Sequence, residues 1–183
     1  MSYLRSLPAE TTLLQVFKAN PDPARHLLDL HEALMRGESS PFTPGERELI
    51  AAYVSGVNSC GYCHGIHTIT AEAFGVPAGL LAAAVADLDS APVDDKLRPV
   101  LAYVGKLTRT PSRMTEADAE AVFAAGWDER ALHDAVLVCA LFNFMNRMVE
   151  GLGIEADAAY TVTSGERLKE GGYAGLAGLL AEA

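Results

Sequence analysis

The stretch CGYCHGIH, residues 60–67, places two thiols and two imidazoles on about two turns of a predicted helix. Cys60, Cys63, His64 and His67 follow the spacing i, i+3, i+4 and i+7. Residues with this spacing lie on one face of a helix. The segment therefore predicts a helix whose one face carries thiol chemistry.

The segments around this stretch also predict helices. Asn58 or Ser59 would cap the helix, and Gly75 would end it. Residues 43–46, Thr-Pro-Gly-Glu, form a capping box with proline at the first helical position. No alternating strand pattern of any length is present, which predicts an all-α fold with helices over about 23–36, 44–54, 60–74, 77–87, 94–108, 115–125 and 129–151.

Length and composition indicate a single domain. The 183 residues are 50% hydrophobic and 21% charged, which is typical of a globular chain with a sizeable core. We expect one domain over residues 1–183, with its core motif at 42–75. The glycine-rich residues 165–183 are weakly patterned and predict a loose C-terminal arm or a surface that docks on another subunit.

Charge and hydropathy exclude several classes of partner. Lys and Arg number 14 against 24 Asp and Glu, and no basic run is present, which argues against nucleic acid and anionic membranes. The N-terminus lacks the apolar stretch of a signal peptide, and the longest apolar runs, 80–86 and 135–142, are too short to span a bilayer. We therefore expect a soluble, cytoplasmic protein. In that compartment, a CxxC pair is more often catalytic or metal-binding than structural.

The cysteines sit where a helix favours a thiolate. Cys60 falls in the first turn, where unpaired N–H groups and the helix dipole stabilise an anion, so both cysteines are expected to have a lowered pKa. Side chains lean toward the helix N-terminus, so His67 reaches Cys63 more readily than Cys60. Glu48, on the preceding helix, could orient His67 or accept its proton through water if the two helices are antiparallel. Nucleophile, base and orienting group form an activated thiol.

A structural zinc site is the main alternative for the cysteines. Cys60, Cys63 and a histidine are possible ligands, but the fourth would be His64 or Cys139, and neither has ordinary zinc-finger spacing. Redox chemistry is favoured, and no metal is expected. Cys139 itself is more typical of a small buried apolar residue.

Other polar residues have plain structural interpretations. Glu48 alone, next to Glu46 and Arg47, is more typical of a solvated helix carboxylate, and His64 of an exposed neighbour of the site. A polar patch on the helix 129–151 could line the thiol pocket or cap another helix, and satisfied buried polar groups are the favoured interpretation. No role is predicted for three isolated histidines. The patch consists of Asn143, Asn146 and Arg147, and the histidines are His26, His31 and His133.

The pattern Glu48-x11-Cys60-x2-Cys63-x3-His67 resembles the alkylhydroperoxidase AhpD core of the carboxymuconolactone decarboxylase superfamily, most closely its uncharacterised peroxidase-related branch. The resemblance is specific over about residues 42–75, and 142–154 looks similar less specifically. It implies that Cys63 is the peroxidatic cysteine, that Cys60 forms the disulfide with it, and that Glu48 and His67 are the proton relay. AhpD proper has a histidine where this chain has Tyr62.

The residues and the resemblance together predict a thiol-dependent peroxidase that reduces organic or hydrogen peroxides. The expected partners are the peroxide substrate and an external dithiol or thiol reductant, without cofactor or metal. The resemblance also implies a homo-oligomer, commonly a trimer or hexamer. Two alternatives stay open: a non-redox decarboxylase that uses Glu48 and His67, and a CxxC redox sensor with little turnover.

Overall fold

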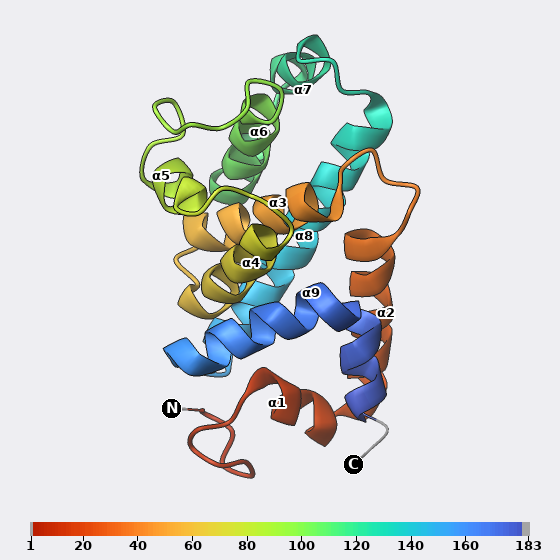
Figure 1. Cartoon of the computed structure of the whole chain (residues 1–183), viewed down its shortest axis with the longest axis vertical. Helices are drawn as coiled ribbons and strands as arrows, with labels where there is room; N and C mark the ends of the chain where they lie inside the picture. Colours follow the sequence, from red (N-terminus) through yellow and green to blue (C-terminus); the bar gives the residue numbers. More distant parts are fainter. Residues whose placement is uncertain (1, 181–183) are drawn as a thin grey trace.

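The structure, a computed structural model, describes residues 2–180, and in this range the chain is all-α without a strand (Figure 1). Two helices precede the hairpin that carries Glu48 and the cysteine pair, two form this hairpin, and five follow it. A short 3₁₀ turn comes after the sixth helix. Their bounds are α1 Leu13–Ala19, α2 Pro21–Arg36, α3 Pro44–Val57, α4 Gly61–Ala73, α5 Leu80–Ala86, α6 Arg98–Arg109, η1 Pro111–Arg113, α7 Glu116–Ala124, α8 Glu129–Gly151 and α9 Ala158–Leu180.

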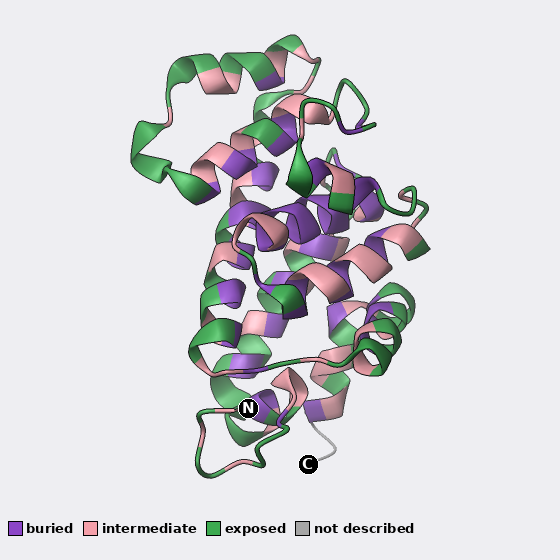
Figure 2. Ribbon diagram, turned by 90° about the vertical axis from the view of Figure 1, so that its left-hand side faces the viewer, coloured by how far each residue is buried: buried purple, intermediate pink, exposed green. Residues whose placement is uncertain are grey.

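The hairpin of α3 and α4 forms the centre of the molecule. The capping box predicted at 43–46 is formed, because the Thr43 side chain accepts from the Glu46 N–H and Glu46 accepts from the Thr43 N–H. From there α3 is buried along most of its length, and buried residues gather in the middle of the molecule (Figure 2). The two helices are antiparallel, since Glu48 bonds to His67 and the Ala52 carbonyl to His64. This antiparallel hairpin brings the predicted relay residues together.

The C-terminal segment differs from the sequence-based expectation. The prediction of a loose arm from residue 165 is wrong for residues 165–180, which belong to α9 and pack against α4 and α2; residues 181–183 lie outside the described range. Glycine explains the close approach. A Cβ at Gly165 would lie 2.6 Å from the Cβ of Ile69, and the Thr70 hydroxyl donates to the Gly165 carbonyl. Small residues that weaken the helical pattern are what let α9 pack tightly.

A kink divides α9 at Gly172, where φ is 60° and ψ −163°. Positive φ costs glycine little, whereas other residues rarely adopt it. Beyond the kink, the Tyr173 and Ala174 N–H groups donate to Oε2 of Glu32 on α2 at 2.8 and 2.9 Å. Glu32 therefore caps the last helical segment from a distant part of the chain.

Smaller differences concern helix ends. The helix α3 continues through Gly56 to Val57, and the residue that caps α4 is Cys60 rather than Asn58 or Ser59. The sequence also did not predict α1. Among the described residues, no helix is both long and apolar enough to cross a membrane.

Candidate active site

The two cysteines of the thiol pair lie at the start of α4, inside the core. Cys60 is fully buried and Cys63 is 3% exposed, and neither forms a disulfide. The turn before them is tight: Ser59 has φ 57°, and the Cys60 N–H donates to the Ser55 carbonyl at 3.0 Å. This turn holds Cys60 at the helix N-cap, where a sulfur can accept backbone N–H groups.

The two thiols share a proton unequally. The pKa of Cys60 is lowered, first because the Cys63 thiol donates to its sulfur and then, against the opposing effect of burial, because the Cys63 backbone N–H also donates to it. The pKa of Cys63 is raised well above its usual range by that same hydrogen bond, by burial and by the nearby Cys60 charge. The expectation that both cysteines have a lowered pKa is therefore wrong for Cys63. Two thiols in contact do not both ionise readily, and the helix N-cap decides which does.

Glu48 and His67 form a close pair across the α3–α4 hairpin. Oε2 of Glu48 lies 2.6 Å from Nδ1 of His67. Because a carboxylate only accepts, Nδ1 carries the proton, and Nε2 is the nitrogen left for chemistry. The His67 ring is held edge-on against Phe142, with 4.5 Å between the ring centroids. The predicted orienting contact between these two residues is thus present.

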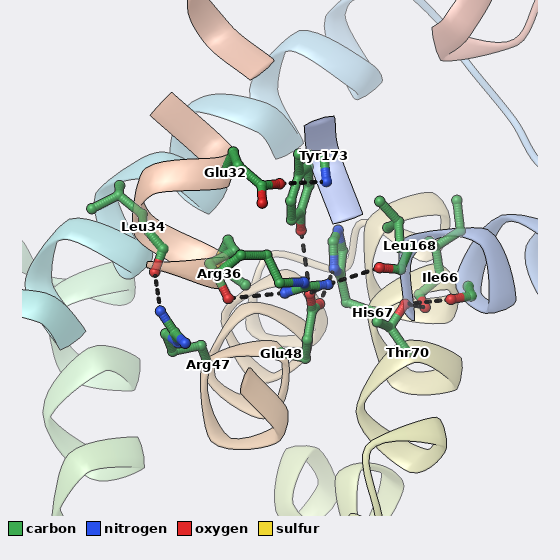
Figure 3. A network of polar contacts seen from close by, with 12 residues as sticks. Glu32, Leu34, Arg36, Arg47, Glu48, Ile66, His67, Thr70, Leu168 and Tyr173 are labelled. Atoms are coloured by element: carbon green, nitrogen blue, oxygen red, sulfur yellow. Dashed lines mark hydrogen bonds and ion pairs between the residues drawn. The ribbon is translucent and has the colours of Figure 1, made fainter. Parts of the chain in front are cut away.

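Glu48 is not a solvated carboxylate, and that interpretation is wrong. Its side chain has no exposed surface, and Oε1 accepts from the Arg36 guanidinium at 2.7 Å and from the Tyr173 hydroxyl at 3.4 Å (Figure 3). Burial raises the pKa of Glu48, but the charge and hydrogen bonds of His67 and then Arg36 outweigh it, so the pKa is lowered. Glu48 is therefore an anion held between α2, α4 and α9.

A cavity lies beside this network and joins it to one of the two sulfurs. Cys63 and His67 line it, whereas Cys60 does not. Most of the remaining lining is apolar and comes from α1, α2, α8 and α9. A molecule entering this cavity would meet Cys63 and not Cys60.

The sulfur and the imidazole face the same cavity without touching. Among the described residues, no hydrogen bond joins His67 to Cys63 or Cys60; Nδ1 is bonded to Glu48, and Nε2 is bonded to neither sulfur. The sequence-based expectation that His67 reaches over Cys63 is met only in that both side chains line one space. A proton passing between them must travel through a molecule in the cavity.

Comparison with known proteins finds a family match over part of the chain. The carboxymuconolactone decarboxylase family matches residues 21–104, which include Glu48, both cysteines of the pair and His67. This stretch is a carboxymuconolactone decarboxylase family domain. Among curated proteins, no sequence matches the chain.

Solved structures share the AhpD-like fold of this chain. An uncharacterized peroxidase-related protein from Silicibacter sp. TM1040 is 29% identical with a TM-score of 0.75, over 81% of this chain and 78% of that one. An alkylhydroperoxidase AhpD core protein from Ralstonia eutropha JMP134, also described as uncharacterized and peroxidase-related, is 24% identical with a TM-score of 0.74 over the same shares. A putative antioxidant defence protein AhpD from Agrobacterium tumefaciens is 17% identical with a TM-score of 0.68, over 81% of this chain and 99% of that one.

Helix α2, inside the matched stretch, and α9, outside it, supply site residues that sequence reasoning missed. His31 lines the cavity, and its Nδ1 donates to the Leu27 carbonyl at 2.7 Å. Burial lowers the pKa of His31 to about 4, against the opposing effect of the Leu27 hydrogen bond. Arg36 and Tyr173 hold Glu48 from the same two helices. No spacing in the sequence signals these residues, because α2 and α9 are far apart along the chain.

The polar patch on α8 serves the turn that carries the cysteines. Asn146 accepts from Asn58 at 2.9 Å and donates to Ser55 at 3.0 Å, and its hydrogen bond to Cys63 acts to lower the pKa of that thiol. Asn143 also accepts from Asn58. The patch is therefore a satisfied polar network, as favoured, and through Asn146 it reaches the thiol pair as well.

The position that is histidine in AhpD proper has a different contact here. The Tyr62 hydroxyl donates to the Tyr160 hydroxyl at 3.2 Å, and the ring lines the cavity. Burial and then the neighbouring Tyr160 raise the pKa of Tyr62 well above its usual value. Tyr62 is thus a neutral part of the cavity lining.

The two candidates for a fourth zinc ligand have other contacts. His64 Nδ1 bonds to the Ala52 carbonyl at 2.9 Å and is half-buried rather than exposed. Cys139 is fully buried and bonds to Thr108 on α6, as expected for a small core residue. In the part of the chain that the structure describes, no three His, Cys, Asp or Glu side chains are grouped as metal ligands.

Proposed function

We propose that this protein is a thiol-dependent peroxidase of the AhpD type. The observation that carries the proposal is that Cys63 shares a cavity with an imidazole whose Nδ1 is bonded to a buried carboxylate. The family match and the peroxidase-related descriptions of similar structures support the same chemistry.

In the first step, the Cys63 sulfur attacks the terminal oxygen of a hydroperoxide and the O–O bond breaks. Cys63 becomes a sulfenic acid, and the thiol proton passes by way of His67 Nε2 to the departing alkoxide, giving an alcohol. Glu48 keeps the proton on Nδ1, so that Nε2 can accept and return one. The hydroperoxide, lying between sulfur and imidazole, bridges the gap that no direct hydrogen bond spans.

In the second step, the Cys60 thiolate attacks the Cys63 sulfenic sulfur. A disulfide forms, and the hydroxyl leaves as water after taking up one proton. The Cys63 backbone N–H, which donates to the Cys60 sulfur and acts to lower the pKa of Cys60, is unchanged by oxidation of the Cys63 side chain and favours the attacking thiolate. An external dithiol then reduces the disulfide and is itself oxidised, which returns both cysteines to the starting state.

Steady-state consumption of hydrogen peroxide and tert-butyl hydroperoxide, with a panel of dithiol donors, tests the proposal. We expect turnover that depends on the donor and is lost in Cys63→Ser. A single stoichiometric oxidation with every donor would instead indicate a redox sensor. Decarboxylation of a cyclic lactone that survives replacement of both cysteines would indicate the non-redox enzyme.

A further inference from the structure

A cationic side chain lines the cavity. Arg167 of α9 lines it and is half-buried, yet among residues 2–180 no hydrogen bond or ion pair holds its guanidinium. One turn earlier, the Ser164 hydroxyl lines the same cavity, is buried, and also lacks a partner. Residues three apart are neighbours on a helix surface, so the two groups can hold one ligand together. Their shared chemistry, a guanidinium and a hydroxyl donor, suits an anion.

The rest of the lining suits an aliphatic body. Leu14, Phe17, Leu28, Met145 and Leu176 are among the side chains around the cavity. Apolar walls with few polar groups bind apolar ligands and use the polar groups to fix their orientation. Hydrogen peroxide is too small and too polar to contact both the apolar walls and Arg167.

The packing of α4 against α9 separates the anion-binding groups from the sulfur. Tyr62 pairs with Tyr160, and Thr70 bonds to Gly165, so the helices run in the same direction with Cys63 near the level of Tyr160. At 1.5 Å per residue, Arg167 then lies roughly 10 Å further along α9. A ligand that reaches both places needs a short aliphatic chain between its two ends.

We propose that the cavity binds an aliphatic hydroperoxide that carries a carboxylate, with the carboxylate on Arg167 and Ser164 and the hydroperoxide at Cys63. This inference rests on the proposed peroxidase function and names its substrate class. The Cys63 sulfur takes the terminal oxygen, the O–O bond breaks, and the product is a hydroxy carboxylate. The planar guanidinium of Arg167 matches the two oxygens of a carboxylate. One of these oxygens can also accept a hydrogen bond from the Ser164 hydroxyl.

Binding can be measured without any turnover. We expect octanoate to bind the reduced protein about tenfold to a hundredfold more tightly than 1-octanol by titration calorimetry, the range for a hydrogen bond to a charged group. Arg167→Gln should remove this preference. Lys169→Gln, which removes an exposed cation from the same helix, is the matched control and should keep it. Equal binding of acid and alcohol, or an equal loss in both variants, would overturn the proposal.

Turnover separates this inference from the function on which it rests. With a dithiol donor, we expect kcat/KM for 8-hydroperoxyoctanoate to exceed that for its methyl ester by about tenfold to a hundredfold, and the ratio to approach one in Arg167→Gln. Turnover of acid and ester at the same kcat/KM would overturn the carboxylate site and leave the peroxidase function standing. Failure to turn over any hydroperoxide would overturn the peroxidase function, whatever octanoate does.

Discussion

The two sides of the cavity differ in how they are encoded. The α3–α4 side carries Glu48, Cys63 and His67, which lie close in sequence and meet because one hairpin folds antiparallel. The α2–α9 side carries His31 and Arg167, which come from segments more than a hundred residues apart, while Arg36 of α2 holds Glu48 without lining the cavity. Local spacing in the sequence places the reactive groups of the first side. The charge and shape of the second side arise only when α2 packs against α9. Local spacing in the sequence therefore predicts the chemistry of this site better than it predicts the substrate.

The largest effect should come from the reactive sulfur on the α3–α4 side. Cys63→Ser is expected to abolish peroxide turnover, because a serine hydroxyl is not ionised as a thiol is and forms no sulfenic acid. The measurement is steady-state peroxide consumption with excess dithiol. Cys139→Ser, a buried cysteine away from the cavity, is the control and should retain turnover. Full activity in Cys63→Ser would place the chemistry elsewhere.

The proton shuttle should give the next largest effect. His67→Ala is expected to slow the reaction with peroxide by about a hundredfold to ten-thousandfold, the usual contribution of general acid–base catalysis. Much of this loss should be recovered at alkaline pH, where the thiol ionises without help. Stopped-flow oxidation across pH measures it. His64→Ala is the matched control, because that ring bonds to the Ala52 carbonyl outside the cavity; equal losses in both variants would remove the shuttle role.

The ion pair between Glu48 of α3 and Arg36 of α2 should contribute to the free energy of unfolding. Glu48→Gln leaves the Arg36 guanidinium buried without its anion, which costs about 3–5 kcal/mol when a buried pair is broken. Urea denaturation of wild type and variant measures this loss. Arg36→Met combined with Glu48→Gln should recover part of it, because no charge is then left unpaired. A near-neutral Glu48→Gln would mean that water reaches the pair in solution.

Sequence reasoning succeeded where local signals agree. The bounds of α8 follow from Asp128 as N-cap, and the pairing of Glu48 with His67 follows from two helices joined by a short turn. It failed for α9, because glycines at 165 and 172 look like a flexible tail until Ile69 and Glu32 are placed against them. Long-range contacts, absent from any local pattern, decide both positions.

The same limit applies to electrostatics. The helix N-terminus predicts a lowered pKa for a cysteine in the first turn, and Cys60 follows this rule. Cys63 departs from it because the two thiols compete for one negative charge, and Cys60 is the N-cap. The sequence does not reveal the counter-charge of Glu48, because Arg36 lies twelve residues earlier on another helix, outside any helical spacing rule.

On the α2–α9 side, His31 should make stability depend on pH. Its pKa of about 4 in the folded protein lies below the ordinary 6.5, so the unfolded chain binds more protons between these values. The contribution of neutral His31 to the free energy of unfolding should be fully present above about pH 6.5. It should fall by ~3 kcal/mol as the pH drops toward 4. Urea denaturation at several pH values measures the slope.

The control for this slope removes the buried imidazole. His31→Leu should flatten the dependence between pH 6.5 and 4. His26→Leu, an exposed histidine on the same helix, should keep the wild-type slope. Parallel slopes in wild type and His31→Leu would contradict the burial of a neutral His31.

The smallest effect should come from the cap at the kink of α9. Glu32→Ala removes the acceptor for the Tyr173 and Ala174 N–H groups, and loss of an N-cap costs about 1 kcal/mol. Thermal or urea unfolding measures it. Asp29→Ala, an exposed carboxylate on the same helix, should cost much less. If both cost the same, residues 173–180 do not depend on Glu32.

The identity of the sulfur that meets the substrate is tested most directly by trapping its oxidised form. Cys60→Ser, reduced and treated with one equivalent of peroxide, should carry a dimedone-labelled sulfenic acid on Cys63 by mass spectrometry, because Cys63 lines the cavity and Cys60 does not. Cys63→Ser treated in the same way should leave Cys60 unlabelled. Label on Cys60 in Cys63→Ser, with none on Cys63 in Cys60→Ser, would show that the roles of the two cysteines are reversed.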